Sequence, residues 1–259
     1  MVSVVVPIYN GKEYIKETVD SILAQSILSE VILIDDCSSD GSYDYIMKLY
    51  GGIPLVSILK NESNQGFCKT ANRGIECAKS EFVLVMGQDD LLDETHCENM
   101  LSCMSDDVNM VFCDYDLIDG VGKVIDSTNH CAHRERMIED LCRFNTIPSV
   151  GLIMKKSAVE KVGGYPENDD FPNYGEYHLW IRMALTGRAV FCGKTRSKYR
   201  RHQTNMTNSF GDRKTKIKLN RYFNTCRRQV IDNKKVSIKT KIYTLLFMGY
   251  YALKLHIFR

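Results

Sequence analysis

The adjacent carboxylates of Asp89 and Asp90 are the residues best suited to chemistry, and they follow an apolar run at 82–86. Neighbouring carboxylates repel unless a cation or hydrogen-bond donors lie between them, and divalent cations prefer hard oxygen ligands. The pair is therefore a candidate site for a divalent cation, and that cation would neutralise a departing diphosphate. Such a pair is also common at helix starts, where Asp90 or Asp93 would serve as an N-cap.

A second acidic pair, Asp35-Asp36, follows the apolar run 31–34. One of its carboxylates could accept a hydrogen bond from a base N–H or a ribose hydroxyl, as acidic residues do in dinucleotide sites. The alternative is a turn that precedes a capped helix. Further along, Gly66 permits an unusual backbone angle or the close approach of a ligand. Lys69 could point at a nucleotide or remain a solvated lysine.

Alternating strands and helices would position these groups. The β-branched apolar runs are typical of buried parallel strands, and the segments between them have helical spacing. The expected elements are strands at 2–8, 31–34, 55–59 and 82–86, with helices at 13–25, 42–49 and 67–78. This order predicts a mostly parallel sheet with helices on both faces. Ligands bind beyond the carboxyl ends of such strands, where both acidic pairs fall.

The pattern loosens after a strand at 109–115. Residues 116–147 are polar and predict a loop with one helix. The later expected elements are strands at 150–154 and 190–192, with helices at 157–162, 176–186, 210–230 and 236–257.

Composition fits a folded protein of 259 residues, with 44% hydrophobic and 25% charged residues. None of the ten cysteines forms a C-x-x-C pair, so a zinc ribbon or a thioredoxin-type site has little support. No basic leader precedes the first apolar run, so we expect no secretory signal. Reduced, mostly buried thiols and a cytoplasmic location are therefore expected.

Charge is distributed unevenly. Residues 194–259 hold 18 Lys and Arg against two acidic residues, whereas residues 1–193 hold 16 against 30. A basic tail on an acidic body suggests an anionic partner such as a phospholipid surface, a lipid diphosphate or a nucleic acid, although a solvated helical surface is the simpler reading. The apolar run 242–253 is too short to span a bilayer. It fits an interfacial helix on the cytoplasmic face of a membrane, or a helix that closes the domain.

Five motifs in order resemble family 2 of the glycosyltransferases, which has the GT-A fold. The matching segments are Val4–Asn10, Val31–Asp36, Asn64–Gly74, Val162–Glu167 and Tyr199–His202. The resemblance implies an α/β GT-A catalytic domain over 1–207, with a nucleotide-binding half (1–115) and an acceptor-binding half (116–207). Residues 208–259 would form a basic, partly apolar helical region.

The resemblance also implies a reaction. An inverting enzyme would move a sugar from a nucleotide-diphosphate donor, most simply a UDP-sugar, to a hydroxyl of a glycan or lipid-linked acceptor in cell-surface polysaccharide synthesis. The cofactor would be Mn²⁺ or Mg²⁺. The implied site residues are Asp90 and His202 for the metal, Pro7, Tyr9, Asp35, Asp36, Asn64, Lys69 and Asp89 for the nucleotide sugar, and Glu176 as general base.

The sequence departs from the family pattern at two glycines. Gly87 occupies the place of the first Asp of the metal motif. Gly175-Glu176 stands where the family has Glu-Asp, so the base would be a glutamate whose pKa burial must raise towards neutrality. The alternative for Glu176 is a carboxylate that only favours the helix dipole. The alternative for His202 is a structural histidine.

Three other classes compete with this reading. A nucleotidyltransferase would need a Gly-rich phosphate loop, of which residues 7–12 are a poor version. A catalytically degenerate sugar-binding protein of the same fold is favoured by Gly87 and Gly175. A nucleic-acid binder is disfavoured, because the basic tail lacks any recognisable module.

Overall fold

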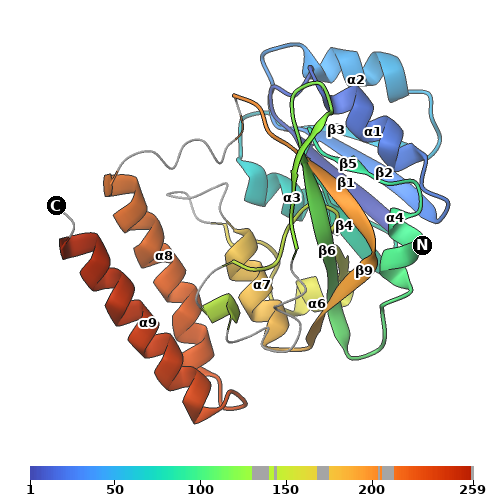
Figure 1. Cartoon of the computed structure of the whole chain (residues 1–259). Coiled ribbons are helices and arrows are strands. Elements are labelled where there is room, and N and C mark those ends of the chain that lie inside the picture. The colour runs from blue at the N-terminus through green and yellow to red at the C-terminus, as the bar shows by residue number, and fades with distance from the viewer. Residues whose placement is uncertain (130–139, 143–144, 168–174, 204, 206–212, 258–259) are drawn as a thin grey trace.

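The computed structural model describes residues 1–129, 140–142, 145–167, 175–203, 205 and 213–257 (Figure 1). Its first half is the expected alternation of strands and helices. The bounds are β1 Val2–Ile8, α1 Ile15–Leu23, β2 Leu28–Asp35, α2 Ser42–Tyr50, β3 Val56–Lys60, α3 Phe67–Cys77 and β4 Phe82–Val85. These strands pair in parallel in the order β3-β2-β1-β4. Each expected element of this half is confirmed.

The second half extends the same sheet. Its elements are β5 Leu91–Leu92, α4 His96–Leu101, β6 Val108–Ile118, β7 Val124–Ser127, β8 Ile153–Lys155, α6 Lys156–Lys161, α7 Glu176–Ala184 and β9 Arg188–Arg200. The order continues β4-β8-β6-β9-β5, and β7 pairs with β6. β8 is antiparallel to both β4 and β6, whereas β6 and β9 are parallel. The sheet is thus parallel up to β4 and mixed beyond it.

Strand alternation divides the core into two layers. Val4 and Val6 of β1 face α1, α2 and α4, whereas Val5 faces α3, α6 and α7. Successive strand residues point to opposite faces, so a run of valines supplies apolar contacts to both layers of helices. Because helices cover both faces of the sheet, polar side chains are accommodated at the edge formed by the carboxyl ends of the strands.

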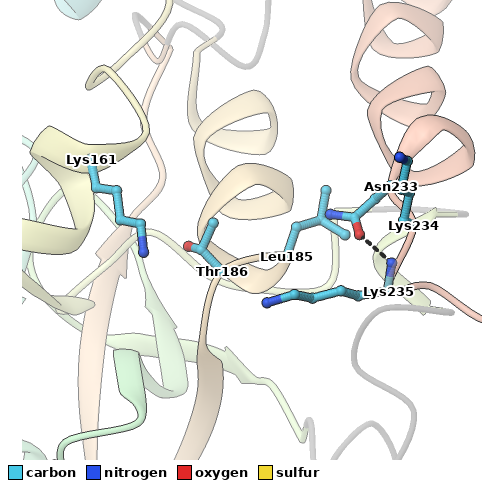
Figure 2. Close-up of a pocket in the computed structure, with 6 residues that line it drawn as sticks. All are labelled: Lys161, Leu185, Thr186, Asn233, Lys234 and Lys235. Carbon is cyan, nitrogen blue, oxygen red and sulfur yellow. Dashed lines mark hydrogen bonds between the residues drawn. The ribbon is translucent and has the colours of Figure 1, made fainter.

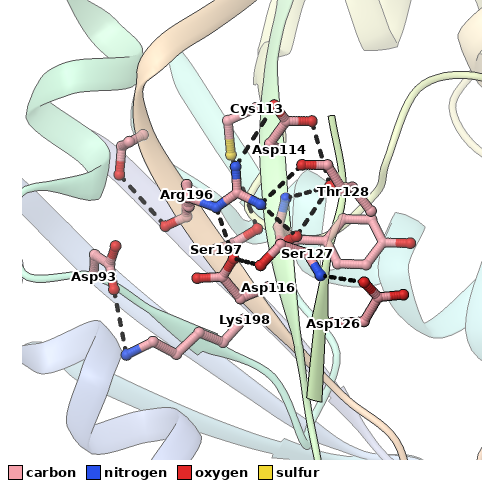
Figure 3. Close-up of polar contacts among 12 residues, drawn as sticks. Asp93, Cys113, Asp114, Asp116, Asp126, Ser127, Thr128, Arg196, Ser197 and Lys198 are labelled. Atoms are coloured by element: carbon pink, nitrogen blue, oxygen red, sulfur yellow. Dashed lines mark hydrogen bonds and ion pairs between the residues drawn. The ribbon is translucent and has the colours of Figure 1, made fainter. Parts of the chain in front are cut away.

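The expected loop at 116–147 is wrong over its first part, and β9 is much longer than the expected strand at 190–192. Charged residues lie inside these strands because they neutralise one another across the sheet (Figure 3). The guanidinium of Arg196 in β9 lies 2.8 Å from Asp116 Oδ1 and 3.7 Å from Asp114 Oδ2, both in β6. Ser127 of β7 donates to Asp116 at 2.7 Å. The rest of the expected loop falls largely outside the described residues, with 140–142 helical.

Two long helices follow the sheet, as expected: α8 Arg213–Asp232 and α9 Ile238–Ile257. They form a hairpin in which α8 packs against α7 (Figure 1). Cys226 and Val230 of α8 are fully buried in the core layer that includes Trp180 of α7. All nine cysteines in the described part of the chain are free thiols.

A substitution at Gly74 tests how closely α3 packs on the sheet. A Cβ at this position would lie 2.2 Å from Val5 Cγ1 and 3.0 Å from Ile34 Cδ1. We expect Gly74→Ala to lower the free energy of unfolding by about 1–3 kcal/mol through overpacking. Gly249→Ala is the matched control, because a Cβ there meets nothing within 4 Å, and it should gain up to about 1 kcal/mol of helix propensity. Urea unfolding measures both. Equal effects would contradict the close packing.

Candidate active site

The loops after β1 and β4 are tied together where these neighbouring strands end. The side chain of Gln88 accepts from Tyr9 N at 2.8 Å and donates to Tyr9 O at 3.1 Å. The side chain of Tyr9 is 49% exposed, so its ring stands at the open edge of the sheet. Pro7 is half-buried within β1. Two of the expected donor-binding residues therefore lie beside the expected metal loop.

The acidic pair after β2 has two different environments. Asp36 Oδ1 accepts from Asn61 Nδ2 at 2.7 Å and from Gln65 N at 2.8 Å, while its Oδ2 accepts from Gly66 N at 2.8 Å. Asp36 therefore holds the loop that leads into α3. Asp35 is fully buried and accepts from a backbone N–H through Oδ2, but its Oδ1 has no partner among the described residues. Of the two, Asp35 has the spare acceptor.

The opening of α3 contains the remaining expected donor contacts. Gly66 has φ of 80° and ψ of 165°, a backbone conformation open to glycine alone, and it precedes the first turn that carries Lys69. Asn64 is exposed, and its Oδ1 accepts from Gly66 N at 3.1 Å. Lys69 is half-buried in the first helical turn. The backbone of this loop is thus fixed by hydrogen bonds to the side chains of Asp36 and Asn64.

A fully buried arginine organises the Asp89-Asp90 segment. The backbone N–H of Arg200 donates to Asp90 Oδ1 at 3.0 Å, and its Nε donates to Asp89 O at 2.9 Å. The guanidinium also pairs with Glu17 at 2.7 Å and donates to Gly120 O at 3.1 Å. Arg200 therefore joins the metal-motif loop to α1 and to the β6–β7 turn.

His202 belongs to the same cluster. Its Nε2 lies 2.7 Å from Asp89 Oδ2, and its ring lies 4.8 Å from that of Tyr14. Asn205 Nδ2 also donates to Asp89 Oδ2, at 3.3 Å. The structure thus brings His202 to the expected metal loop, where it bonds to a carboxylate.

Burial and like charge raise the pKa of Asp90 well above its usual range. Desolvation is the largest cause, and the Asp89 charge adds to it. A Cβ on Gly87 would lie 2.8 Å from Asp90 Oδ2 and 3.0 Å from Asp89 Oδ1, so both oxygens border the space that Gly87 leaves open. Carboxylate oxygens that repel one another fit a hard divalent cation. Within the described ranges no three His, Cys, Asp or Glu converge on a metal position.

Glu176 begins α7 and lies near the same region. It is close enough to raise the pKa of Asp90 through its charge. Its own pKa is raised by desolvation, and a hydrogen bond with Ser149 opposes that shift. Gly175 before it packs tightly: a Cβ there would lie 2.6 Å from Cys68 Sγ. A buried carboxylate with a raised pKa has the properties of a general base.

His178, two residues further along α7, turns away from this cluster. Its Nε2 lies 3.2 Å from Gln229 Nε2 of α8, and its ring stacks on Tyr222. Burial and the nearby Arg182 lower its pKa to about 4. It belongs to the helical packing and not to the site.

Sequence reasoning missed four residues of the site. Arg200 lies within the Tyr199–His202 motif, which was a signal that could have identified it. Gln88, Ser149 and Asn205 had no such signal, because their roles depend on partners distant in sequence.

Comparison with known proteins identifies the class. Residues 3–163 match the family described as glycosyl transferase family 2, so the chain belongs to family 2 of the glycosyltransferases. It is 33% identical over 128 residues to the putative glycosyltransferase EpsH of Bacillus subtilis, covering 49% of this chain and 37% of that one. It is 31% identical over 149 residues to the putative teichuronic acid biosynthesis glycosyltransferase TuaG of the same organism, covering 57% and 58% respectively.

Solved structures show the fold. TarS 1–349 of S. aureus in complex with UDP-GlcNAc has a TM-score of 0.72 at 17% identity, covering 99% of this chain and 73% of that one. The mannosyltransferase PcManGT of Pyrobaculum calidifontis, in complex with GDP-Man and Mn²⁺, has a TM-score of 0.69 at 17% identity, covering 98% and 72%. The expected α/β fold of the GT-A type is thus confirmed.

The raised pKa of Asp90 gives a prediction about stability. In the unfolded chain Asp90 ionises near its ordinary pKa, but the fold holds the proton more tightly, so stability falls as the pH rises through the folded-state pKa. We expect Asp90→Asn to raise the unfolding free energy in metal-free buffer at neutral pH, because the amide removes the buried charge and keeps an oxygen that can accept from Arg200 N. The gain should shrink as the pH is lowered.

Thermal melts across pH measure this effect, and Asp106→Asn serves as the exposed control. A lower melting temperature for Asp90→Asn at neutral pH would mean that the ionised carboxylate stabilises the empty fold.

Proposed function

We propose that the protein is an inverting, metal-dependent glycosyltransferase. It would transfer a sugar from a nucleotide-diphosphate donor, most simply a UDP-sugar, to a hydroxyl of a glycan or lipid-linked acceptor. The observation that carries the proposal is the convergence of Glu176, whose pKa is raised, with Asp90 at the carboxyl edge of the sheet. One group can accept a proton, and the other can help to hold the charge of a leaving diphosphate.

The named relatives support the finer parts of this proposal. TarS was solved with UDP-GlcNAc, which supports a UDP-sugar donor. PcManGT was solved with Mn²⁺, which supports a divalent cation. The name of TuaG refers to teichuronic acid biosynthesis, which supports a role in cell-surface polysaccharide synthesis. Free thiols throughout the described chain support work in the cytoplasm.

We assign the proposed roles to successive regions of the chain. Residues 1–115 would bind the nucleotide, with Asp35 accepting from base or ribose and Tyr9 beside the base. Residues 116–207 would bind the acceptor, and 208–259 would form the basic helical region. Asp90 and Asp89 would hold Mn²⁺ or Mg²⁺, with His202 orienting Asp89 or completing the diphosphate site. When bound, that cation would neutralise charge on the diphosphate.

The reaction would be a single displacement. The acceptor oxygen forms a bond to the anomeric carbon as the bond from that carbon to the diphosphate oxygen breaks. Glu176 removes the hydroxyl proton of the acceptor, and the electron pair of the broken bond leaves on the diphosphate. Attack from the face opposite the leaving group inverts the anomeric configuration.

A degenerate sugar-binding protein of the same fold is the second candidate. Gly87 and Gly175, which replace two family carboxylates, favour it. Donor hydrolysis in the presence of Mn²⁺ separates the two candidates, because a binding protein would bind the nucleotide sugar without consuming it. Because the chain belongs to family 2 of the glycosyltransferases, we no longer consider it a nucleotidyltransferase.

Glu176→Gln tests the base. The amide cannot take the acceptor proton, so turnover should fall by at least about 100-fold, the low end of the contribution of general bases. Donor binding, measured by calorimetry with Mn²⁺, should stay within about twofold. Glu160→Gln on α6 is the control and should retain full activity. Wild-type turnover in Glu176→Gln would remove this residue from the mechanism.

Ser149→Ala tests the tuning of that base. The hydrogen bond from Ser149 lowers the pKa of Glu176, so its loss should raise that pKa further. Because the base must be ionised, activity falls as the pH drops through its pKa. The acid limb of the pH–rate profile should therefore move to higher pH in Ser149→Ala, with activity recovered in alkaline buffer. An unmoved limb with uniformly lower activity would indicate that Ser149 acts only in packing.

A further inference from the structure

In α9 threonines are buried and large apolar residues are exposed, which is the reverse of an ordinary surface helix. The side that packs towards the protein contains Thr240 and Thr244, which are 3% and 0% exposed. The opposite side contains large apolar residues that are 51–77% exposed: Ile238, Ile242, Leu245, Leu246 and Tyr250. Their spacing of i, i+4, i+7, i+8 and i+12 places them on one stripe of the helix. We call this stripe the outer face of α9.

Internal packing does not require this arrangement. Thr244 Oγ1 donates to Thr240 O at 2.8 Å, and the hydroxyls of Thr240 and Ser237 lie 2.8 Å apart, so both buried threonines have partners within the helix or directly before it. Phe247, on the inner side, lies 5.1 Å from the guanidinium of Arg227 in α8. The apolar residues of the outer face therefore add nothing to the contact with α8. A contiguous apolar face of this kind in water marks a surface that binds something.

Charge indicates what would cover it. The hairpin sequence from 213 to 257 holds twelve Lys and Arg and one acidic residue, Asp232. Lys239 on α9 is exposed next to the outer face, as are Lys234 and Lys235 in the turn before it. Two copies of such a helix would bring like charges together. A negatively charged surface that accepts apolar side chains matches both properties, and the anionic headgroup layer of a membrane is such a surface.

A pocket at the α8–α9 turn adds a second basic feature. Its volume is about 440 Å³, and it is lined by Lys161, Leu185, Thr186, Asn233, Lys234 and Lys235. Lys161 from α6 and Lys235 from the turn enter it from opposite sides (Figure 2). Its lining contains three ammonium groups and no carboxylate. It lies at the end of the hairpin where α9 begins.

The length and apolar content of α9 determine how it could contact a membrane. None of the described helices is both long and apolar enough to cross a bilayer. A helix with one apolar face and lysines beside it lies in the plane of the interface instead. We propose that the outer face of α9 docks on the anionic surface of a membrane, with Lys234, Lys235 and Lys239 contacting lipid phosphates. This proposal rests on the hairpin alone and is independent of the proposed sugar transfer.

Vesicle co-sedimentation of the full chain tests it. We expect the wild type to bind phosphatidylcholine vesicles that contain phosphatidylglycerol at least about tenfold more tightly than pure phosphatidylcholine, with binding that weakens in salt. Ile242→Ser/Leu246→Ser removes apolar area without changing charge and should reduce the partition coefficient at least about tenfold. Lys234→Gln/Lys235→Gln should reduce the preference for the anionic lipid.

The matched control is Met47→Ser/Leu55→Ser, which removes two side chains that are 42% and 46% exposed on α2 and before β3. It should bind vesicles as the wild type does. Thermal melts establish that every variant folds. Donor hydrolysis in vesicle-free solution should be the same in all of them, which separates failure of this inference from failure of the enzymatic proposal.

Three outcomes would overturn the inference. One is a wild type that does not bind anionic vesicles. Another is an Ile242→Ser/Leu246→Ser variant that binds as tightly as the wild type. The third is sedimentation that shows a wild-type dimer which this variant converts to monomer with vesicle binding unchanged, since the outer face would then join two copies of the chain.

Discussion

The site depends on the ion pair and hydrogen bonds made by the buried guanidinium of Arg200. A charge that is fully removed from water is tolerated only when it is paired and hydrogen-bonded. Arg200 meets this condition by binding Glu17 of α1, the carbonyl of Asp89 after β4 and the turn after β6. Three segments that are separated along the chain are thereby held at one edge of the sheet. The carboxylates of the proposed metal site are thus positioned by a residue that need not touch substrate.

The same principle explains why the two carboxylates after β2 differ. Asp36 is surrounded by donors from residues 61–66 and orders that loop, whereas Asp35 keeps one oxygen without a partner. Identical residue types in adjacent positions thus take on different tasks according to the donors around them. The unsatisfied oxygen is the more costly arrangement for the empty protein, and a bound ligand would relieve that cost.

Sequence patterns predicted the first half of the fold because its strands are continuous β-branched runs with periodic helices between them. The same reasoning missed β7 and predicted β6 and β9 too short, because polar residues there neutralise one another across strands. Arg196 and Asp116 are 80 residues apart, so no local window shows that their charges meet. The positions of Asp89, Asp90 and Glu176 could be predicted from motifs and strand ends. The contributions of Gln88, Ser149 and Asn205 could not, since each depends on a distant partner.

The tight fit of Gly175 has a consequence for how this chain could change over evolutionary time. The space that a side chain would need is filled by Cys68 Sγ and by Pro166 Cδ, which would lie 2.6 Å and 2.9 Å from a new Cβ. Restoring the Glu-Asp pair of the family would take a substitution at both 175 and 176, and the new side chain at 175 would collide with these two atoms unless they moved. Room for such a side chain would require both Cys68 and Pro166 to move or to be replaced by smaller residues. Positions 175, 68 and 166 therefore constrain one another through sterics, directly before Glu176 in the sequence.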